Sequence, residues 1–164
     1  MVTLNKKKGK NMEKLICFDM DGTIADFYNQ KEWLQDLNQE KTTPYDNAKP
    51  MINIKELNAI CSKLRSHGWQ VGIITWLAKN STPEYKKAVR QSKKEWLQKV
   101  GFNYDFFHGV QYGYTKADTI RNADIAILFD DNVKVRRSFK GLSFDEKNIL
   151  KTLKQILRYE ERSF

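Results

Sequence analysis

The sequence predicts an α/β fold, Rossmann-like in outline, with a mostly parallel sheet covered by helices on both faces. Short apolar runs alternate along the chain with longer segments in which apolar residues recur at helical spacing. Polar residues, several of them acidic, follow directly after these runs. A length of 164 residues is sufficient for one domain with a sizeable core. We therefore expect one α/β domain with its ligand at the carboxyl edge of the sheet.

The first half of the chain contains two predicted strands. Residues 14–18 form a continuous apolar run of the kind found in strands buried on both faces. Aromatic residues without a strand pattern follow, so we expect a small insertion at about 26–50. A helical pattern then ends at Gly68, and residues 71–74 form a second short strand that leads into Thr75.

The second half contains the remaining predicted elements. A helix begins at residues 81–83, where Ser-Thr-Pro places a proline at the first helical position, and it ends at Gly101. Residues 106–110 and 125–129 are predicted strands, and a short helix is predicted between them at 115–122. The last helix carries apolar residues at helical spacing, namely Ile149, Leu153, Ile156 and Leu157.

The formal net charge is +9, and residues 1–14 contribute +4 of it. Because this Lys- and Asn-rich leader has few apolar residues, we expect residues 1–13 to form a disordered basic tail and residues 14–164 to form a single domain. The remaining positive charge favours an anionic ligand. No apolar run reaches the length of a bilayer span and no secretory signal is visible, so we expect a cytoplasmic protein without membrane contacts.

The two cysteines do not suggest a metal site or a disulfide. Cys17 lies in an apolar run and Cys61 in a helical pattern, without the close spacing of zinc ligands. We expect both to be buried, reduced thiols.

Acidic and hydroxyl side chains follow three of the predicted strands. Asp19 and Asp21 come after the first strand, Thr75 after the second, and Asp130 and Asp131 after the fourth. Because the carboxyl ends of parallel strands lie at one edge, we expect these side chains to converge. Carboxylates at close range repel one another and raise one another's pKa, so we expect a bound cation to neutralise their charge. Oxygen ligands without His or thiolate favour a hard ion, and we expect Mg²⁺.

The spacing of Asp19 and Asp21 suits phosphoryl transfer. Residues at i and i+2 point the same way while the chain is extended, and Gly22 then permits a sharp turn. One carboxylate can attack phosphorus to form an aspartyl-phosphate, while its neighbour protonates the leaving oxygen and later activates water.

Four motifs in this sequence resemble those of the haloacid dehalogenase (HAD) superfamily of phosphohydrolases. Residues 18–23, Phe-Asp-Met-Asp-Gly-Thr, are similar to its first motif, and residues 73–75 are similar to its second. Lys116 and the pair at 130–131 are similar to the third and fourth. All four occur in the family's order over residues 15–132.

The resemblance implies a HAD fold with a small cap insertion and a Mg²⁺-dependent phosphatase. It implies that Asp19 is the nucleophile and that Asp21 is the general acid and base. The implied phosphate-binding residues are Thr75 and Lys116, and we also expect Trp76, the residue after Thr75, at the phosphate. The implied metal-binding residues are Asp19, Asp21 through its backbone carbonyl, Asp130 and Asp131.

Two of these assignments have alternatives. Lys134 or Lys140 could take the phosphate-binding role of Lys116, which we prefer because its distance from Asp130 fits a short helix followed by a strand. Trp76 stands where the family commonly has a small hydroxyl residue, and we expect it to narrow the site or to stack on a base.

Within the superfamily, residues 19–27 most resemble the 5'(3')-deoxyribonucleotidase group, which also has a small cap after the first motif. Residues 94–97 and 128–131 are similar to that group as well. This resemblance implies a nucleoside monophosphate as substrate and a homodimer as the assembly.

Phe27, Tyr28 and Trp33 in the insertion permit two interpretations. They can bind the substrate by stacking on its base, or they can form the small apolar core of the insertion. Two other functions also stay open, a polynucleotide 3'-phosphatase and a nucleic-acid-binding protein that keeps the fold without the chemistry. Both would make nucleic acid a partner of the basic surface.

Overall fold

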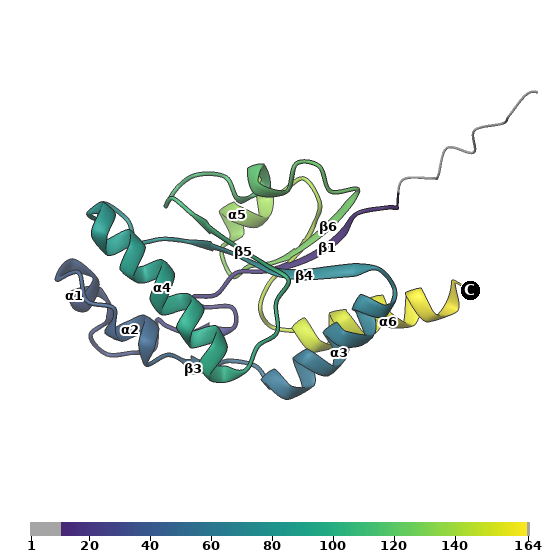
Figure 1. Cartoon of the computed structure of the whole chain (residues 1–164), viewed down its shortest axis with the longest axis horizontal. Helices are drawn as coiled ribbons and strands as arrows, with labels where there is room; N and C mark the ends of the chain where they lie inside the picture. Colours follow the sequence, from purple (N-terminus) through teal and green to yellow (C-terminus); the bar gives the residue numbers. More distant parts are fainter. Residues whose placement is uncertain (1–10, 164) are drawn as a thin grey trace, which may run out of the picture.

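A parallel sheet forms the centre of the protein. The computed structural model describes residues 11–163, so the predicted basic tail lies outside the described residues except at 11–13. The strand order is β5-β4-β1-β6-β7 (Figure 1). The strands are β1 Lys14–Phe18, β4 Trp69–Trp76, β5 Phe106–Val110, β6 Ile125–Phe129 and β7 Leu142–Phe144.

The central strand β1 aligns the acidic residues at one edge. Phe18 pairs in register with Ile73 of β4 and with Phe129 of β6. Asp19 and Asp130 follow these strands directly, and the backbone N–H of Asp19 donates to the carbonyl of Phe129 at 2.9 Å. The carboxyl ends of β1 and β6 therefore lie side by side, as the sequence predicts.

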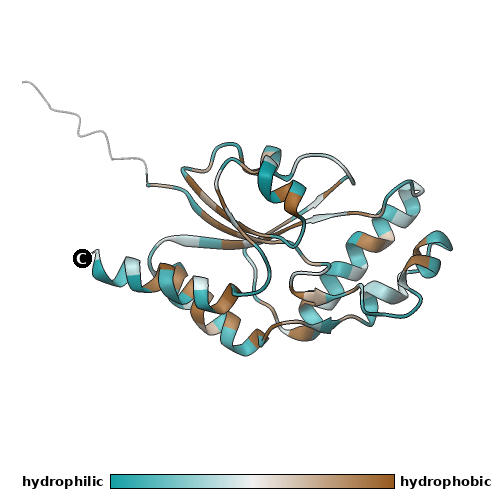
Figure 2. Ribbon diagram, turned by 180° about the vertical axis from the view of Figure 1, so that it is seen from behind, coloured by the Kyte–Doolittle hydropathy of each residue, from teal (hydrophilic) through white to brown (hydrophobic). Residues whose placement is uncertain are grey.

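Helices cover both faces of the sheet, which confirms the predicted α/β fold. Alternate side chains of β1 face opposite cores: Ile16 and Phe18 belong to one, while Leu15 and Cys17 belong to the other. Figure 2 shows apolar residues concentrated along the strands. The first core is covered by α3 Ile54–Ser66, α4 Pro83–Val100 and α6 Ile149–Arg162, and the second by α5 Val133–Ser138 and the 3-10 helix η1 Lys116–Ile120.

Helix α4 begins and ends where its capping residues predict. The hydroxyl of Thr82 accepts a hydrogen bond from the backbone N–H of Tyr85 at 3.2 Å, and Pro83 occupies the first turn. Gly101 ends the helix in the left-handed conformation, with φ of 77°.

A small insertion between β1 and α3 packs beside α4 (Figure 1). The sequence predicts no strand there, but Ala25–Asp26 (β2) and Lys49–Pro50 (β3) form a short antiparallel pair. Two residues are too few to produce an alternating pattern, so the sequence prediction was wrong at this point. The pair closes the base of the insertion, which contains two helices, α1 Trp33–Asn38 and α2 Thr43–Asp46.

Other differences from the sequence prediction concern short elements. The segment predicted as a helix at 115–122 is the 3-10 helix η1, and β4 is longer than the predicted strand at 71–74. Helix α5 and the edge strand β7 were not predicted, because neither has more than six residues in which to show a period. Within residues 11–163, no helix combines the length and the apolar character that a membrane crossing requires.

Candidate active site

A tight turn after β1 brings two acidic segments together. Gly22 has φ of 79°, a conformation that residues with a side chain rarely adopt. A Cβ at Gly22 would also lie 2.5 Å from Oδ2 of Asp131 and 2.9 Å from the ring of Tyr28. Glycine is therefore needed both for the turn and for the close approach of Asp131.

Three carboxylates gather at the edge of the sheet. Asp19, Asp130 and Asp131 each offer an oxygen, and these atoms all lie within 4.8 Å of one another. The Nζ atom of Lys116 lies 2.9 Å from Oδ1 of Asp19 and 2.6 Å from Oδ2 of Asp130. Three carboxylates against one ammonium leave an excess of negative charge in a largely buried site.

This acidic group fits a divalent metal ion. Burial and the charge of Asp19 raise the pKa of Asp130 to about 6 and that of Asp131 to about 7, so their charged forms need a cation. The donors are all carboxylate oxygens, which suit a hard ion such as Mg²⁺. Lys116 itself stays charged: burial lowers its pKa, but the neighbouring Asp19 and Asp130 outweigh burial and raise it.

Neighbouring groups hold the carboxylates in place. The hydroxyl of Thr23 lies 3.3 Å from Oδ2 of Asp19 and 3.2 Å from Oδ1 of Asp131. The backbone N–H of Asn132 donates to Asp130 at 2.9 Å. Thr23 is the last residue of the first motif, but sequence reasoning gave it no role because its contacts with Asp131 come from a distant part of the chain.

Lys93 on α4 is a second buried lysine at the site, and the sequence analysis missed it. It is fully buried, and its Nζ atom donates to Oδ2 of Asp21 at 2.7 Å. Burial raises the pKa of Asp21, and the charge of Lys93 opposes that rise. The sequence does contain a signal for it: Lys93 falls at helical spacing between Val89 and Trp96, on the apolar stripe of its helix.

A cavity of about 310 Å³ lies at this edge of the sheet, against the insertion. The structure brings nine of the ten predicted site residues to it. They are Asp19, Asp21, Phe27, Tyr28, Trp33, Trp76, Lys116, Asp130 and Asp131.

Thr75 differs from the other predicted site residues because it does not line the cavity. Its side chain is fully buried, and its hydroxyl oxygen accepts a hydrogen bond from Lys93 at 2.7 Å. Its direct contact with phosphate stays a prediction. The alternative lysines, Lys134 and Lys140, are exposed and lie outside the cavity lining.

The aromatic residues of the insertion have different surroundings. Phe27 is buried, with its ring centroid 4.8 Å from that of Tyr45 and 5.5 Å from that of Trp33. Tyr28 is half exposed, and its ring meets that of Trp33 edge to face. Phe27 thus belongs mainly to the core of the insertion, while Tyr28 presents a ring toward solvent and the cavity.

Trp76, at the end of β4, also lines the cavity. Its indole Nε1 donates to the carbonyl of Tyr114 at 2.9 Å, and its ring pairs with Tyr112 at 4.9 Å between centroids. The Nζ atom of Lys116 lies 5.2 Å from the centroid of Trp76. Trp76 therefore lines the cavity beside Lys116, the lysine that contacts Asp19 and Asp130.

Comparisons with known proteins agree with this architecture. Neither a protein-family model nor a curated protein matches the chain. Among solved structures, a chain of the Pnkp1/Rnl/Hen1 RNA repair complex is similar with a TM-score of 0.55 and 16% sequence identity, covering 82% of this chain and 42% of that chain. This chain thus spans less than half of that protein's length.

A second similar structure is D,D-heptose 1,7-bisphosphate phosphatase from Burkholderia thailandensis. Its TM-score is 0.50 and its sequence identity 12%, and the match covers 88% of this chain and 99% of that chain. At such identities the likeness concerns the fold. With the strand order β5-β4-β1-β6-β7 and the small antiparallel insertion after β1, the chain has a HAD-like fold.

Proposed function

We propose that this chain is a HAD-type phosphohydrolase that depends on Mg²⁺ and acts through an aspartyl-phosphate. One observation carries the proposal: Asp19, at the end of the central strand, shares a largely buried site with Asp130, Asp131 and Lys116. Such a site offers a nucleophile, an anion-binding ammonium and the ligands of a hard cation. The HAD-like fold supports the same chemistry.

In the proposed mechanism, a carboxylate oxygen of Asp19 attacks the phosphorus atom of a phosphomonoester. The bond from phosphorus to the leaving oxygen breaks, and Asp21 gives its proton to that oxygen. Asp21 then takes a proton from water, which attacks phosphorus and releases inorganic phosphate and free Asp19. Lys116 neutralises charge on the phosphoryl oxygens during both steps.

Mg²⁺ would be held by the carboxylates of Asp19, Asp130 and Asp131, together with the backbone carbonyl of Asp21. When bound, it would neutralise phosphoryl charge and so allow one anion to approach another.

We propose a nucleoside monophosphate as the substrate, as in a 5'(3')-deoxyribonucleotidase. The cavity volume of about 310 Å³ lies at the small end of the range for ligand pockets, which favours a single small molecule. Its lining includes the rings of Tyr28, Trp33, Trp76 and Tyr112, which can stack on a base.

The first experiment measures phosphate release from ribo- and deoxyribonucleoside 5'- and 3'-monophosphates, with Mg²⁺ and with excess EDTA. We expect hydrolysis of at least one nucleotide class with Mg²⁺ and none with EDTA. We expect Asp19→Asn to keep the circular dichroism spectrum of the wild type and to lose at least ~1,000-fold in turnover, because the nucleophile is removed. Full activity in this variant would exclude the mechanism.

A polynucleotide 3'-phosphatase is the second candidate, favoured by the likeness to a chain of an RNA repair complex and by the net charge of +9. Oligonucleotides with a 3'-phosphate, assayed beside free nucleotides, separate the two substrates. If neither they nor an aryl phosphate are hydrolysed, salt-dependent oligonucleotide binding would favour the non-catalytic nucleic-acid-binding alternative. The homodimer also stays a prediction, which sedimentation can test.

A further inference from the structure

Lys93 has three polar partners and no access to solvent. Its Nζ atom donates to Oδ2 of Asp21 at 2.7 Å, to Oγ1 of Thr75 at 2.7 Å and to the carbonyl of Trp76 at 3.1 Å. An ammonium group has three protons, so each has an acceptor. The ring of Tyr45 lies 5.1 Å from the same nitrogen. All three N–H groups of the ammonium therefore have acceptors, and none is left to bind water or a ligand.

The fold alone does not explain a charge at this position. Residue 93 lies on the apolar stripe of α4 with Val89, Trp96 and Leu97, all buried. An apolar side chain of similar length would fill such a position, and replacing a buried ion pair by apolar residues is often neutral or stabilising. A buried lysine here therefore needs a reason other than packing.

Lys93 also does not line the cavity in which a substrate would bind. It is absent from the residues that line the cavity, whereas its partner Asp21 lines it. Lys93 can therefore influence a reaction only through the groups that it holds. Asp21 is the one charged group among them, and it stands two residues after Asp19.

We propose that Lys93 is a positioning residue that fixes the carboxylate of Asp21 for proton transfer, an inference that rests on the proposed phosphohydrolase function. With Oδ2 held by the ammonium, the rotation of the carboxylate is restricted. The second oxygen, Oδ1, has no hydrogen-bond partner among the described residues and is the atom left for the leaving group and for water. Thr75 and the carbonyl of Trp76 anchor the ammonium from β4, so Asp21 is tied to the strand beside its own.

Two variants test the proposal. Lys93→Met keeps the length of the side chain without its charge, and Lys93→Gln keeps a hydrogen-bond donor. We expect kcat to fall by at least ~100-fold in Lys93→Met, the scale seen when an acid-base group is misplaced, and KM to change by less than about threefold. A merely structural role would disturb Trp76 and Tyr45, which line the cavity, and would raise KM instead.

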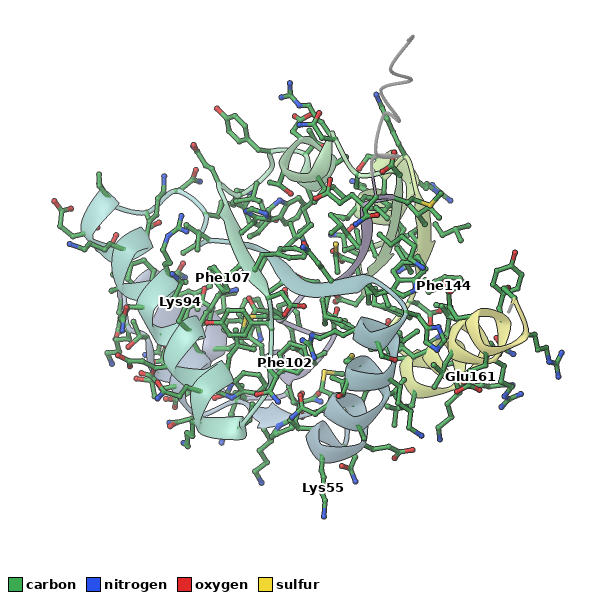
Figure 3. All side chains as sticks on the ribbon, turned by 45° about the vertical axis from the view of Figure 1, so that its right-hand side comes forward. Lys55, Lys94, Phe102, Phe107, Phe144 and Glu161 are labelled. Atoms are coloured by element: carbon green, nitrogen blue, oxygen red, sulfur yellow. The ribbon has the colours of Figure 1, made fainter. Side chains whose placement is uncertain are left out.

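Lys94→Met is the matched control. Lys94 is the next residue on α4, is exposed, and lies with its Nζ atom 5.2 Å from the ring of Phe107 (Figure 3). We expect kcat and KM of this variant to equal those of the wild type. A comparable loss of kcat in Lys94→Met would overturn the proposal, because the effect would then not belong to the buried ammonium.

A double-mutant cycle shows whether Lys93 acts through Asp21. In the Asp21→Asn background, where no carboxylate is left to position, we expect Lys93→Met to lower kcat by less than about threefold. A further large loss in that background would overturn the proposal, and so would unchanged kcat in both Lys93 variants. Failure of both to fold, seen by circular dichroism, would assign the lysine to stability and overturn it too. If the wild type hydrolyses no phosphomonoester, the proposed function itself fails.

Discussion

Two buried lysines contact three of the four acidic residues of the site. Lys116 contacts Asp19 and Asp130, while Lys93 contacts Asp21. Carboxylates rather than water stabilise both ammonium groups, since Lys116 is 3% exposed and Lys93 is fully buried. The nucleophile and the acid-base residue of the proposed mechanism therefore each have a separate cation.

Removing the ammonium of Lys116 should destabilise the protein when no metal is present. Lys116→Met leaves Asp19 and Asp130 buried beside each other without a counter-charge, and breaking a buried ion pair typically costs about 3 kcal/mol or more. We expect thermal unfolding in EDTA to show a clearly lower melting temperature than the wild type. Lys134→Met, at an exposed lysine, should unfold like the wild type. Equal melting temperatures for the two variants would contradict this account.

The site was predictable to the extent that strand ends determine it. Asp19 and Asp130 follow continuous apolar runs, and parallel strands place their ends at one edge, so their meeting could be inferred from the sequence. Lys93 was missed because it lies on a helix, where a lysine is ordinarily expected to be exposed to solvent. The break in that stripe was the available signal.

At the scale of elements, strands buried on both faces were the easiest to predict. β1 and β6 have the bounds that their apolar runs predict, because most of their side chains pack on one core or the other. The edge strand β5 also has its predicted bounds, although Val110 is its one buried residue. The edge strand β7 was missed since Leu142 is 60% exposed and Phe144 is 36% exposed, which leaves no burial pattern. β2 and β3 depend on contacts between distant residues rather than on a local period.

The insertion is fastened along α4 by hydrogen bonds at several points. Tyr85 donates to the carbonyl of Lys41 at 2.6 Å, Ser92 bonds to Asp46, and the indole of Trp96 donates to the carbonyl of Ala48 at 2.7 Å. These contacts span the length of the helix. They indicate an insertion that is firmly attached to α4.

Trp96→Phe tests this attachment. The variant leaves the carbonyl of Ala48 buried without its donor, so we expect the free energy of unfolding to fall by about 1–3 kcal/mol. Trp33→Phe is the comparison, because no hydrogen bond of its indole N–H is present among the described residues and Trp33 is only partly buried. Chemical denaturation measures both. An equal or larger loss in Trp33→Phe would contradict this account, because the hydrogen bond to Ala48 would then not be what stabilises the attachment.

Glu160 links α6 to two strands, and its effect on stability should depend on pH. It accepts hydrogen bonds from Nζ of Lys14 and Nε1 of Trp69, both at 3.0 Å. Burial raises its pKa, but these two hydrogen bonds and the charge of Lys14 outweigh burial, and the pKa of Glu160 is lowered. A lowered pKa in the folded state adds stability above the unfolded pKa, and that stability is lost as the pH falls through the folded pKa.

We therefore expect Glu160→Gln to lower the free energy of unfolding by about 1 kcal/mol near neutral pH. The difference from the wild type should shrink as the pH falls below the ordinary range of a glutamate and through the lowered pKa of Glu160, where its carboxylate becomes protonated. Urea unfolding at a series of pH values measures it. A difference that stays constant across the acidic range would show that the carboxylate charge is not what stabilises this link.

At the scale of the whole molecule, the sign of the charge differs between the surface and the site. The chain carries a net charge of +9, which attracts anions, whereas the lining of the cavity has four carboxylates against two lysines, Lys79 and Lys116. A phosphate drawn to the protein would meet negative charge at the point of reaction. A bound divalent cation resolves this conflict, and its binding should be visible in the stability of the entire fold.

Mg²⁺ should raise the melting temperature of the protein, because an ion that binds the folded state and not the unfolded chain stabilises the former. The folded chain brings oxygens of Asp19, Asp130 and Asp131 within 4.8 Å of one another, an arrangement that the unfolded chain lacks. We expect excess Mg²⁺ to raise the melting temperature above that in EDTA, and Asp131→Asn to remove most of this rise. NaCl at equal ionic strength separates binding from screening. Asp118→Asn, at an exposed aspartate on η1, should keep the full rise. Equal shifts in the wild type and in Asp131→Asn would mean that Mg²⁺ acts elsewhere on the surface, and the metal site proposed at this edge of the sheet would have to be abandoned.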